Sequence, residues 1–190
     1  MSDQWREIAR ISDPLRRTLA LVATVTELLA DEGVRPILVG GMALQFYTLG
    51  GYVTADVDVV ASRRDRVGRV LDQLGFKHQP GFRHWIHEEL DLAIEIPDEV
   101  LAGSLDRVAE VEVDGKTAYV IGIEDLIVDR LNASKHWHSK LDGEWAQRLL
   151  AMYDDEIDHQ YLREACEREQ TLDALQECRQ KAAEFRERQD

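Results

Sequence analysis

The sequence predicts an α+β protein, in which a small mixed β-sheet is flanked by helices and followed by a helical C-terminal part. Two observations indicate this class. Up to residue 122, short apolar or alternating runs recur between segments that carry apolar residues at three- and four-residue spacing. From residue 123 onward, the helical spacing continues with few interruptions. With 190 residues, the chain is long enough to bury one core that carries a helical appendage.

In the first part of the chain, segments with the apolar spacing of a helix alternate with segments that have the apolar or alternating pattern of a strand. Leucines and valines at helical spacing follow residue 14, and Gly33 stands where a C-terminal cap belongs. A short apolar run then ends at a glycine pair, and a later segment alternates in the period of a strand. These patterns predict helices over 14–33, 42–49 and 63–74, and strands over 36–39 and 54–61.

The later part of the chain changes from strands to helices. Apolar runs predict strands over 82–87, 90–96, 108–113 and 117–121. The last two runs flank Asp114-Gly115, a dipeptide that is typical of a tight hairpin turn. From Glu124 we expect helices, with breaks near Gly143 and around Asp154.

Composition limits the classes of function. Apolar residues make up 44% of the chain and charged residues 32%, as in a globular protein with a charged surface. No stretch approaches the roughly 20 uninterrupted apolar residues of a membrane span, and the first residues lack the order of a signal peptide. We therefore expect no membrane partner and a cytoplasmic location. The net charge of −14 argues against broad electrostatic adhesion to DNA or RNA.

The two cysteines, Cys166 and Cys178, lie in the helical C-terminal stretch. Along one straight helix their separation would be about 18 Å, which is too far for a disulfide. Pairing would need a break in that helix or a dimer. We expect free, reduced thiols, which suits a cytoplasmic location.

One combination of residues carries chemistry. Gly40 and Gly41 stand between a predicted strand and a predicted helix, where backbone N–H groups can approach phosphate oxygens because no side chain intervenes. Asp56 and Asp58 follow on the next predicted strand, and their alternate positions place both carboxylates on one face. Two neighbouring carboxylates repel each other unless a divalent cation or solvent compensates them.

This combination resembles the signature of the nucleotidyltransferase superfamily related to DNA polymerase β, a glycine pair followed by Asp-x-Asp or Asp-x-Glu. The resemblance spans roughly residues 36–150. Within the superfamily, the chain looks closest to AbiEii-like and minimal bacterial nucleotidyltransferase-like proteins, and the lincosamide and aminoglycoside nucleotidyltransferases share a similar opening motif. The resemblance implies a nucleotidyltransferase core over 1–122 and a helical region over 123–190 packed on that core.

The superfamily also uses a third carboxylate on a later strand. The predicted strand 90–96 offers Asp91 and Glu95, which are four residues apart and would share one strand face. The Ile-Glu-Ile-Pro context of Glu95 resembles some relatives, whereas the Leu-Asp-Leu context of Asp91 fits the general pattern. We favour Glu95 slightly, and at least one of the two is a solvated surface residue.

The resemblance further implies contacts to the nucleotide phosphates. Many relatives carry an arginine just before the Thr-x-Asp-x-Asp segment, where this chain has Gly51-Tyr52-Val53-Thr54. Thr54 is a candidate contact, while the triphosphate-binding arginine is absent or supplied from elsewhere. The segment 124–142 resembles the helical module in which basic residues face the nucleotide. Its candidates are Arg130, Lys135 and Lys140, for each of which ordinary helix-surface charge is the alternative.

These features predict a nucleotidyltransferase that moves a nucleoside monophosphate from a nucleoside triphosphate to an acceptor hydroxyl. Asp56 and Asp58 would hold Mg²⁺ or Mn²⁺, with Gly40 and Gly41 at the phosphates. The acceptor could be RNA, a small hydroxylated molecule such as an antibiotic, or a protein. The alternative is a catalytically silent binding protein of the same fold, such as the antitoxin of a toxin–antitoxin pair.

Overall fold

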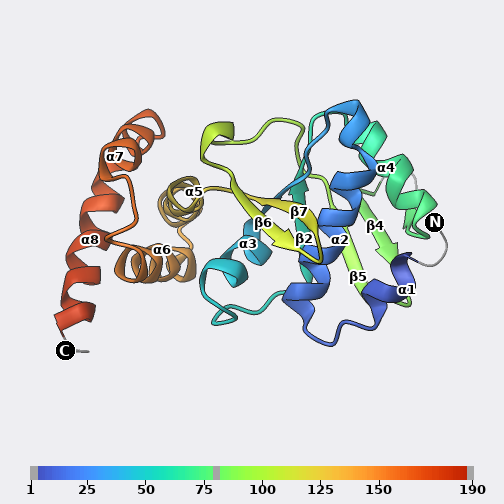
Figure 1. Ribbon diagram of the computed structural model, residues 1–190. Coiled ribbons are helices and arrows are strands. Elements are labelled where there is room, and N and C mark those ends of the chain that lie inside the picture. The colour runs from blue at the N-terminus through green and yellow to red at the C-terminus, as the bar shows by residue number, and fades with distance from the viewer. Residues whose placement is uncertain (1–3, 79–81, 188–190) are drawn as a thin grey trace. The chain divides into compact units, whose positions relative to one another are not determined.

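The computed structural model of the protein describes residues 4–78 and 82–187. Its contacts divide the chain into two compact units, Met1–Ile121 and Gly122–Asp190. The first unit holds a sheet with flanking helices (Figure 1). Its elements are α1 (Gln4–Ala9), α2 (Pro14–Leu28), η1 (Ala30–Glu32), β1 (Ile37–Val39), α3 (Gly40–Tyr47), β2 (Asp56–Val60), α4 (Arg64–Gln73), β3 (Lys77–His78), β4 (His84–His87), β5 (Leu92–Glu95), η2 (Leu105–Arg107), β6 (Ala109–Val113) and β7 (Lys116–Val120).

The sheet of the first unit is mixed. Within the described residues it has seven strands in the order β3-β4-β5-β2-β1-β7-β6. β1 pairs antiparallel with β2 and parallel with β7, and β2 pairs parallel with β5. β4 extends the sheet antiparallel to β5, and β6 does so antiparallel to β7. The predicted α+β class, a mixed sheet with helices, is confirmed.

Alternation of side chains gives the sheet two unlike faces. Val59 on β2 and Ile94 on β5 are buried and point to one face. Helices α2 and α4 cover that face, because Leu21 and Leu71 surround a small void together with these two residues. Asp58, one position before Val59, therefore points to the opposite face.

Local signals set the ends of several elements. The carboxylate of Asp13 caps α2 by accepting a hydrogen bond from the backbone N–H of Arg16 at 2.6 Å. α2 ends before the predicted residue 33, since the short turn η1 follows it and closes at Gly33 with φ +66°. Asp114 and Gly115 adopt φ values of 52° and 77° between β6 and β7, as a two-residue hairpin turn requires.

Several strands are shorter than predicted. The segment 54–61 forms β2 only over Asp56–Val60, and the segment 90–96 forms β5 only over Leu92–Glu95. Asp91 lies in the preceding turn with φ +50°, so it does not share the strand with Glu95 as predicted. Strand β3 was not predicted, because both of its residues are exposed and polar and give no apolar signal.

The second unit is helical. Its elements are α5 (Ile123–His136), α6 (Lys140–Met152), α7 (His159–Arg168) and α8 (Leu172–Glu187). Apolar residues at helical spacing form its core, and Leu131, Leu149 and Leu162 are fully buried. Cys166 in α7 and Cys178 in α8 are both free, and burial raises the pKa of each thiol.

The predicted helix break near Gly143 is wrong. The breaks lie at 137–139, 153–158 and 169–171. Gly143 is inside α6, whose start is fixed by Ser139, the side chain of which accepts a hydrogen bond from the N–H of Asp142 at 3.3 Å. A Cβ atom at Gly143 would lie 2.7 Å from Oγ of Ser134 on α5. The glycine therefore permits close approach of α5 and α6 rather than ending a helix.

Among the helices of the described residues, none combines the length and the apolar composition that a bilayer crossing requires.

The contact at Gly143 predicts an unusual stability effect. Replacing glycine by alanine inside a helix normally stabilises by about 1 kcal/mol. Here the added methyl group would meet Ser134, so we expect Gly143→Ala to lower the free energy of unfolding by about 1 kcal/mol. In a Ser134→Ala background the same change should be stabilising. Urea denaturation of the four proteins measures this cycle, and stabilisation in both backgrounds would contradict the packing argument.

Candidate active site

The turn between β1 and α3 brings the backbone against a carboxylate. Gly40 opens α3 with φ +61°, and a Cβ atom there would overlap the carboxylate of Asp58. A Cβ atom at Gly41 would lie 3.1 Å from Cε1 of Tyr52 and 3.2 Å from Cγ2 of Thr54. Only glycine at position 40 combines this backbone conformation with this close approach.

The helix start at this turn has no side-chain cap from its N-cap residue. The N-cap residue Val39 has no polar atom in its side chain with which to accept a bond from the first turn of α3. The first N–H groups of a helix have no partner within the helix, and the helix dipole favours negative charge beside them. The turn at Gly40 and Gly41 therefore has the features of a phosphate-binding turn.

Sheet register brings the carboxylates together on one face. β1 and β2 pair Val39 with Asp58, and β2 and β5 pair Asp58 with Glu95 and Asp56 with Ala93. Directly opposed residues point to the same face, and neighbouring strands are about 4.8 Å apart. Asp56, Asp58 and Glu95 thus share the face that α2 and α4 leave uncovered.

Glu95 has two basic neighbours that sequence reasoning missed. Its Oε2 lies 3.2 Å from Nε2 of His84, which is its antiparallel partner on β4, and its Oε1 lies 3.8 Å from Nη1 of Arg83. The side chain of Glu95 is 23% exposed, and the Arg83 guanidinium compensates part of its charge. The sequence predicted a strand over 82–87, but no local signal marked its pairing with β5.

The other sequence candidates near the site differ in placement. Asp91 is exposed in the turn before β5, and its N–H donates to the carbonyl of Glu88 at 3.3 Å. Thr54 is half-buried, and its Oγ1 accepts a hydrogen bond from the N–H of Asp56 at 3.3 Å. Thr54 therefore stabilises the entry to β2, whereas Asp91 lies beyond the paired part of the sheet.

Carboxylate oxygens are the ligands that Mg²⁺ and Mn²⁺ prefer, so the chemistry of Asp56, Asp58 and Glu95 fits such an ion. Within residues 4–78 and 82–187, no three His, Cys, Asp or Glu side chains already converge closely enough to hold a metal. A ligand set of all three carboxylates would require side-chain rotation, on a backbone that already sets Asp58 beside Glu95.

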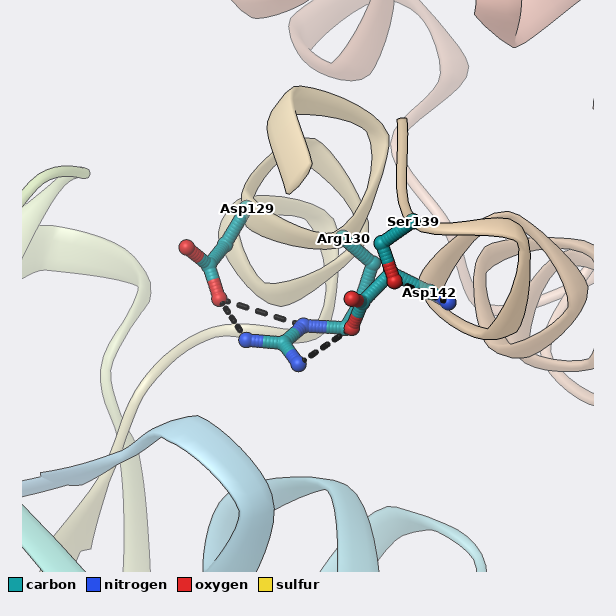
Figure 2. Close-up of polar contacts among 4 residues, drawn as sticks. All are labelled: Asp129, Arg130, Ser139 and Asp142. Atoms are coloured by element: carbon teal, nitrogen blue, oxygen red, sulfur yellow. Dashed lines mark hydrogen bonds and ion pairs between the residues drawn. The ribbon is translucent and has the colours of Figure 1, made fainter. Parts of the chain in front are cut away.

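The basic candidates of the second unit have acidic partners. Figure 2 shows the guanidinium of Arg130 between the carboxylates of Asp129 and Asp142, with 2.6 Å from Nη1 to Oδ1 of Asp142. Burial would lower the pKa of Arg130, but the two carboxylates outweigh it and raise the pKa. Lys135 donates from Nζ to the carbonyl of Gln170 at 2.6 Å and also contacts Asp173.

Lys140 is exposed in the first turn of α6. The three basic candidates therefore lie on two helices of the second unit, and two of them already balance carboxylates of that unit.

The overlap at Gly40 yields a prediction with a matched control. Alanine at Gly40 would adopt a strained φ and also displace the carboxylate of Asp58. Alanine at Gly33, with φ +66° and nothing within 4 Å, would carry the conformational cost alone, about 1–2 kcal/mol. We expect Gly40→Ala to destabilise more than Gly33→Ala in urea denaturation. Equal losses would show that the Asp58 carboxylate moves freely away.

Comparisons with known proteins identify the family and support the fold. Residues 16–189 match the family model described as "Nucleotidyltransferase of unknown function (DUF6036)". No curated protein matches the sequence. A solved "antigenic nucleotidyltransferase-like protein" from Paracoccidioides brasiliensis has the same fold, with a TM-score of 0.57 at 15% identity over 89% of this chain and 93% of that chain.

The antibiotic-resistance factor ANT(2'')-Ia is more distant. Its solution structure gives a TM-score of 0.49 at 15% identity, over 90% of this chain and 91% of that chain. Its crystal structure in complex with adenylyl-2''-tobramycin gives 0.48 at 16% identity, over 90% and 98%. These two likenesses add nothing to the fold that the first one shows, and the family match does not place the chain in the AbiEii-like group. Because the match to the family model extends over residues 16–189, the protein belongs to the nucleotidyltransferase family DUF6036.

Proposed function

We propose that the protein transfers a nucleoside monophosphate from a nucleoside triphosphate to an acceptor hydroxyl, with Mg²⁺ or Mn²⁺ held by Asp56 and Asp58. One observation carries this proposal, the register that aligns Val39, Asp58 and Glu95 across three neighbouring strands. Since Gly40 follows Val39 directly, the phosphate-binding turn and the three carboxylates lie at one end of these strands. Nucleotidyl transfer needs this combination of an anion site beside a cation site.

Each residue of the cluster has a separate part in the reaction. The N–H groups at Gly40 and Gly41 bind phosphate oxygens, and Asp56 and Asp58 hold the cation. The bound cation supplies charge neutralisation at the phosphates. The acceptor oxygen bonds to the α-phosphorus as the bond to the pyrophosphate oxygen breaks. Glu95 accepts the hydroxyl proton or completes the ligand set.

Glu95 supports this third role better than Asp91 does. Its position opposite Asp58 in the register of β2 and β5 supports a shared role at the cation. Its contacts with His84 at 3.2 Å and Arg83 at 3.8 Å favour a defined orientation of its side chain. Asp91, exposed in a turn, lacks such support.

The first prediction concerns binding. Calorimetry with ATP should show association in Mg²⁺ that is lost on chelation. Asp56→Asn with Asp58→Asn should weaken it by more than about a hundredfold, because loss of groups outside the ligand set alone costs 10–100-fold. The control Asp31→Asn with Asp72→Asn removes two exposed carboxylates of the same unit and should leave affinity unchanged. Equal affinity of both double variants would exclude the aspartate pair from metal binding.

A second prediction separates the two candidates for the third carboxylate. With α-labelled nucleoside triphosphates and Mg²⁺ or Mn²⁺, label should enter RNA, hydroxylated small molecules or lysate protein. Glu95→Gln should slow this transfer by about a hundredfold or more, as loss of a general base does, and Asp91→Asn should change it only a few-fold. The reverse order would assign the role to Asp91.

The transfer assay also tests the rival function. Protein that binds ATP but labels none of the three acceptor pools would be a silent binding protein, such as an antitoxin. Label that persists in Asp58→Asn would come from another activity.

A further inference from the structure

A cavity of about 500 Å³ lies in the first unit, next to the carboxylate cluster but separate from it. Its floor is a row of side chains from four adjacent strands. Glu110, Tyr119, Ile37 and Val60 are successive Cα partners across β6, β7, β1 and β2, and all four line the cavity. Opposed residues point to the same face, so the row forms one continuous surface.

This floor belongs to the same face as the proposed reaction centre. Val60 follows Asp58 by two residues on β2, and Ile37 precedes Val39 by two residues on β1. Two residues of strand span about 7 Å. A ligand in the cavity would therefore have to extend about 7 Å along the strands beyond Val60, or about five or six bonds, to reach the level of the Asp58 carboxylate.

The walls of the cavity have a defined chemistry. The segment that joins β5 to β6 contributes apolar side chains, including Leu101 and Leu105. Arg35 stacks its guanidinium 5.4 Å from the centre of the Tyr119 ring. Two carboxylates also line the cavity: Glu110, which is exposed, and Glu99, whose Oε1 accepts a hydrogen bond from the backbone N–H of Arg64 at 2.8 Å.

Size and charge both limit the ligand. Cavities of roughly 300–1,000 Å³ with apolar walls and a few polar groups suit small molecules. The carboxylates of Glu99 and Glu110 would repel the phosphates of a polymer with a phosphodiester backbone. An aromatic or apolar group fits the floor, and an ammonium group would be attracted by these two carboxylates.

We propose that this cavity binds the acceptor, and that the acceptor is a small hydroxylated amine. Its apolar part lies on the row from Tyr119 to Val60, its ammonium lies near Glu99 and Glu110, and its hydroxyl extends along the sheet toward Asp58. The inference that this ligand is the acceptor rests on the proposed function. The inference that the cavity binds amines rests on the cavity alone.

Two probes test the charge preference directly. Tyramine and 4-hydroxyphenylacetate share a hydroxylated ring and carry opposite charges. Titration of each into the ¹⁵N-labelled full chain should give saturable amide shifts at Val60, Ser62 and Tyr119 with tyramine and none with the acid. Added salt should weaken tyramine binding, because salt screens the attraction between the ammonium and the exposed carboxylates.

Three variants test how charges at the cavity change the affinity for tyramine. Glu110→Lys should weaken tyramine binding by about fivefold or more, since it reverses an exposed charge at the ligand. Arg35→Gln should strengthen it by about twofold, because it removes the opposing charge. Glu112→Lys is the matched control: Glu112 is exposed on the same strand and face but does not line the cavity, so binding should stay unchanged.

The outcomes separate this proposal from the proposed function. Equal binding of both probes, no saturable shift up to millimolar tyramine, or equal weakening by Glu110→Lys and Glu112→Lys would overturn the amine site. Label transfer to RNA that Glu110→Lys leaves unchanged would overturn the small acceptor. Tyramine binding without Mg²⁺-dependent ATP binding would keep the amine site and remove the proposed function.

Discussion

The candidate site depends on the antiparallel pairing of β1 with β2. This pairing sets Val39 opposite Asp58, so the turn at Gly40 lies at the level of the carboxylate. A slip by one residue would turn Val57 and Val59 away from α2 and α4 and would bring the aspartates beneath these helices. Burial of apolar surface thus fixes the register, because exposing valines and burying unpaired carboxylates are both costly.

The alternation of side chains between the two faces of the sheet gives one face to the core and the other to the candidate site. One face of the sheet is covered by α2 and α4 and provides apolar burial, as at Val59 and Ile94. The other face carries the three carboxylates of the candidate site, and the cavity floor lies farther along the strands. Polar residues there do not interrupt the core, since each points away from it.

Charge compensation differs between the two units. In the first unit, Glu95 is balanced by His84 and Arg83, while Asp56 is exposed to solvent. In the second unit, Arg130 on α5 balances Asp129 on the same helix and Asp142 on α6, and its contact with Asp142 joins the two helices (Figure 2). A phosphate at Arg130 would have to compete with those carboxylates, and loss of the guanidinium would leave charges without their partner. Arg130 therefore has a structural role that is independent of any nucleotide.

Sequence by itself determined the elements whose signals are local. The helical spacing after residue 14, the hairpin at Asp114-Gly115 and the glycine pair before α3 depend on neighbouring residues, so the chain shows them directly. The alternation around Asp56 and Asp58 also placed both on one face before any pairing was known. The predicted helix break near Gly143 was wrong because glycine is a helix breaker only by a local rule. In the folded chain, Gly143 lies inside α6 and packs against Ser134.

Tertiary structure decided which strands became neighbours. Glu95 lies beside Asp58 because β5 pairs parallel with β2, and His84 lies beside Glu95 because β4 pairs with β5. The cavity floor joins the consecutive strands β1 and β2 to the consecutive strands β6 and β7, because β1 pairs parallel with β7, which is distant in the chain. Such proximity arises from long-range burial and hydrogen bonding between strands, and the period of each strand alone contains no information about its partners.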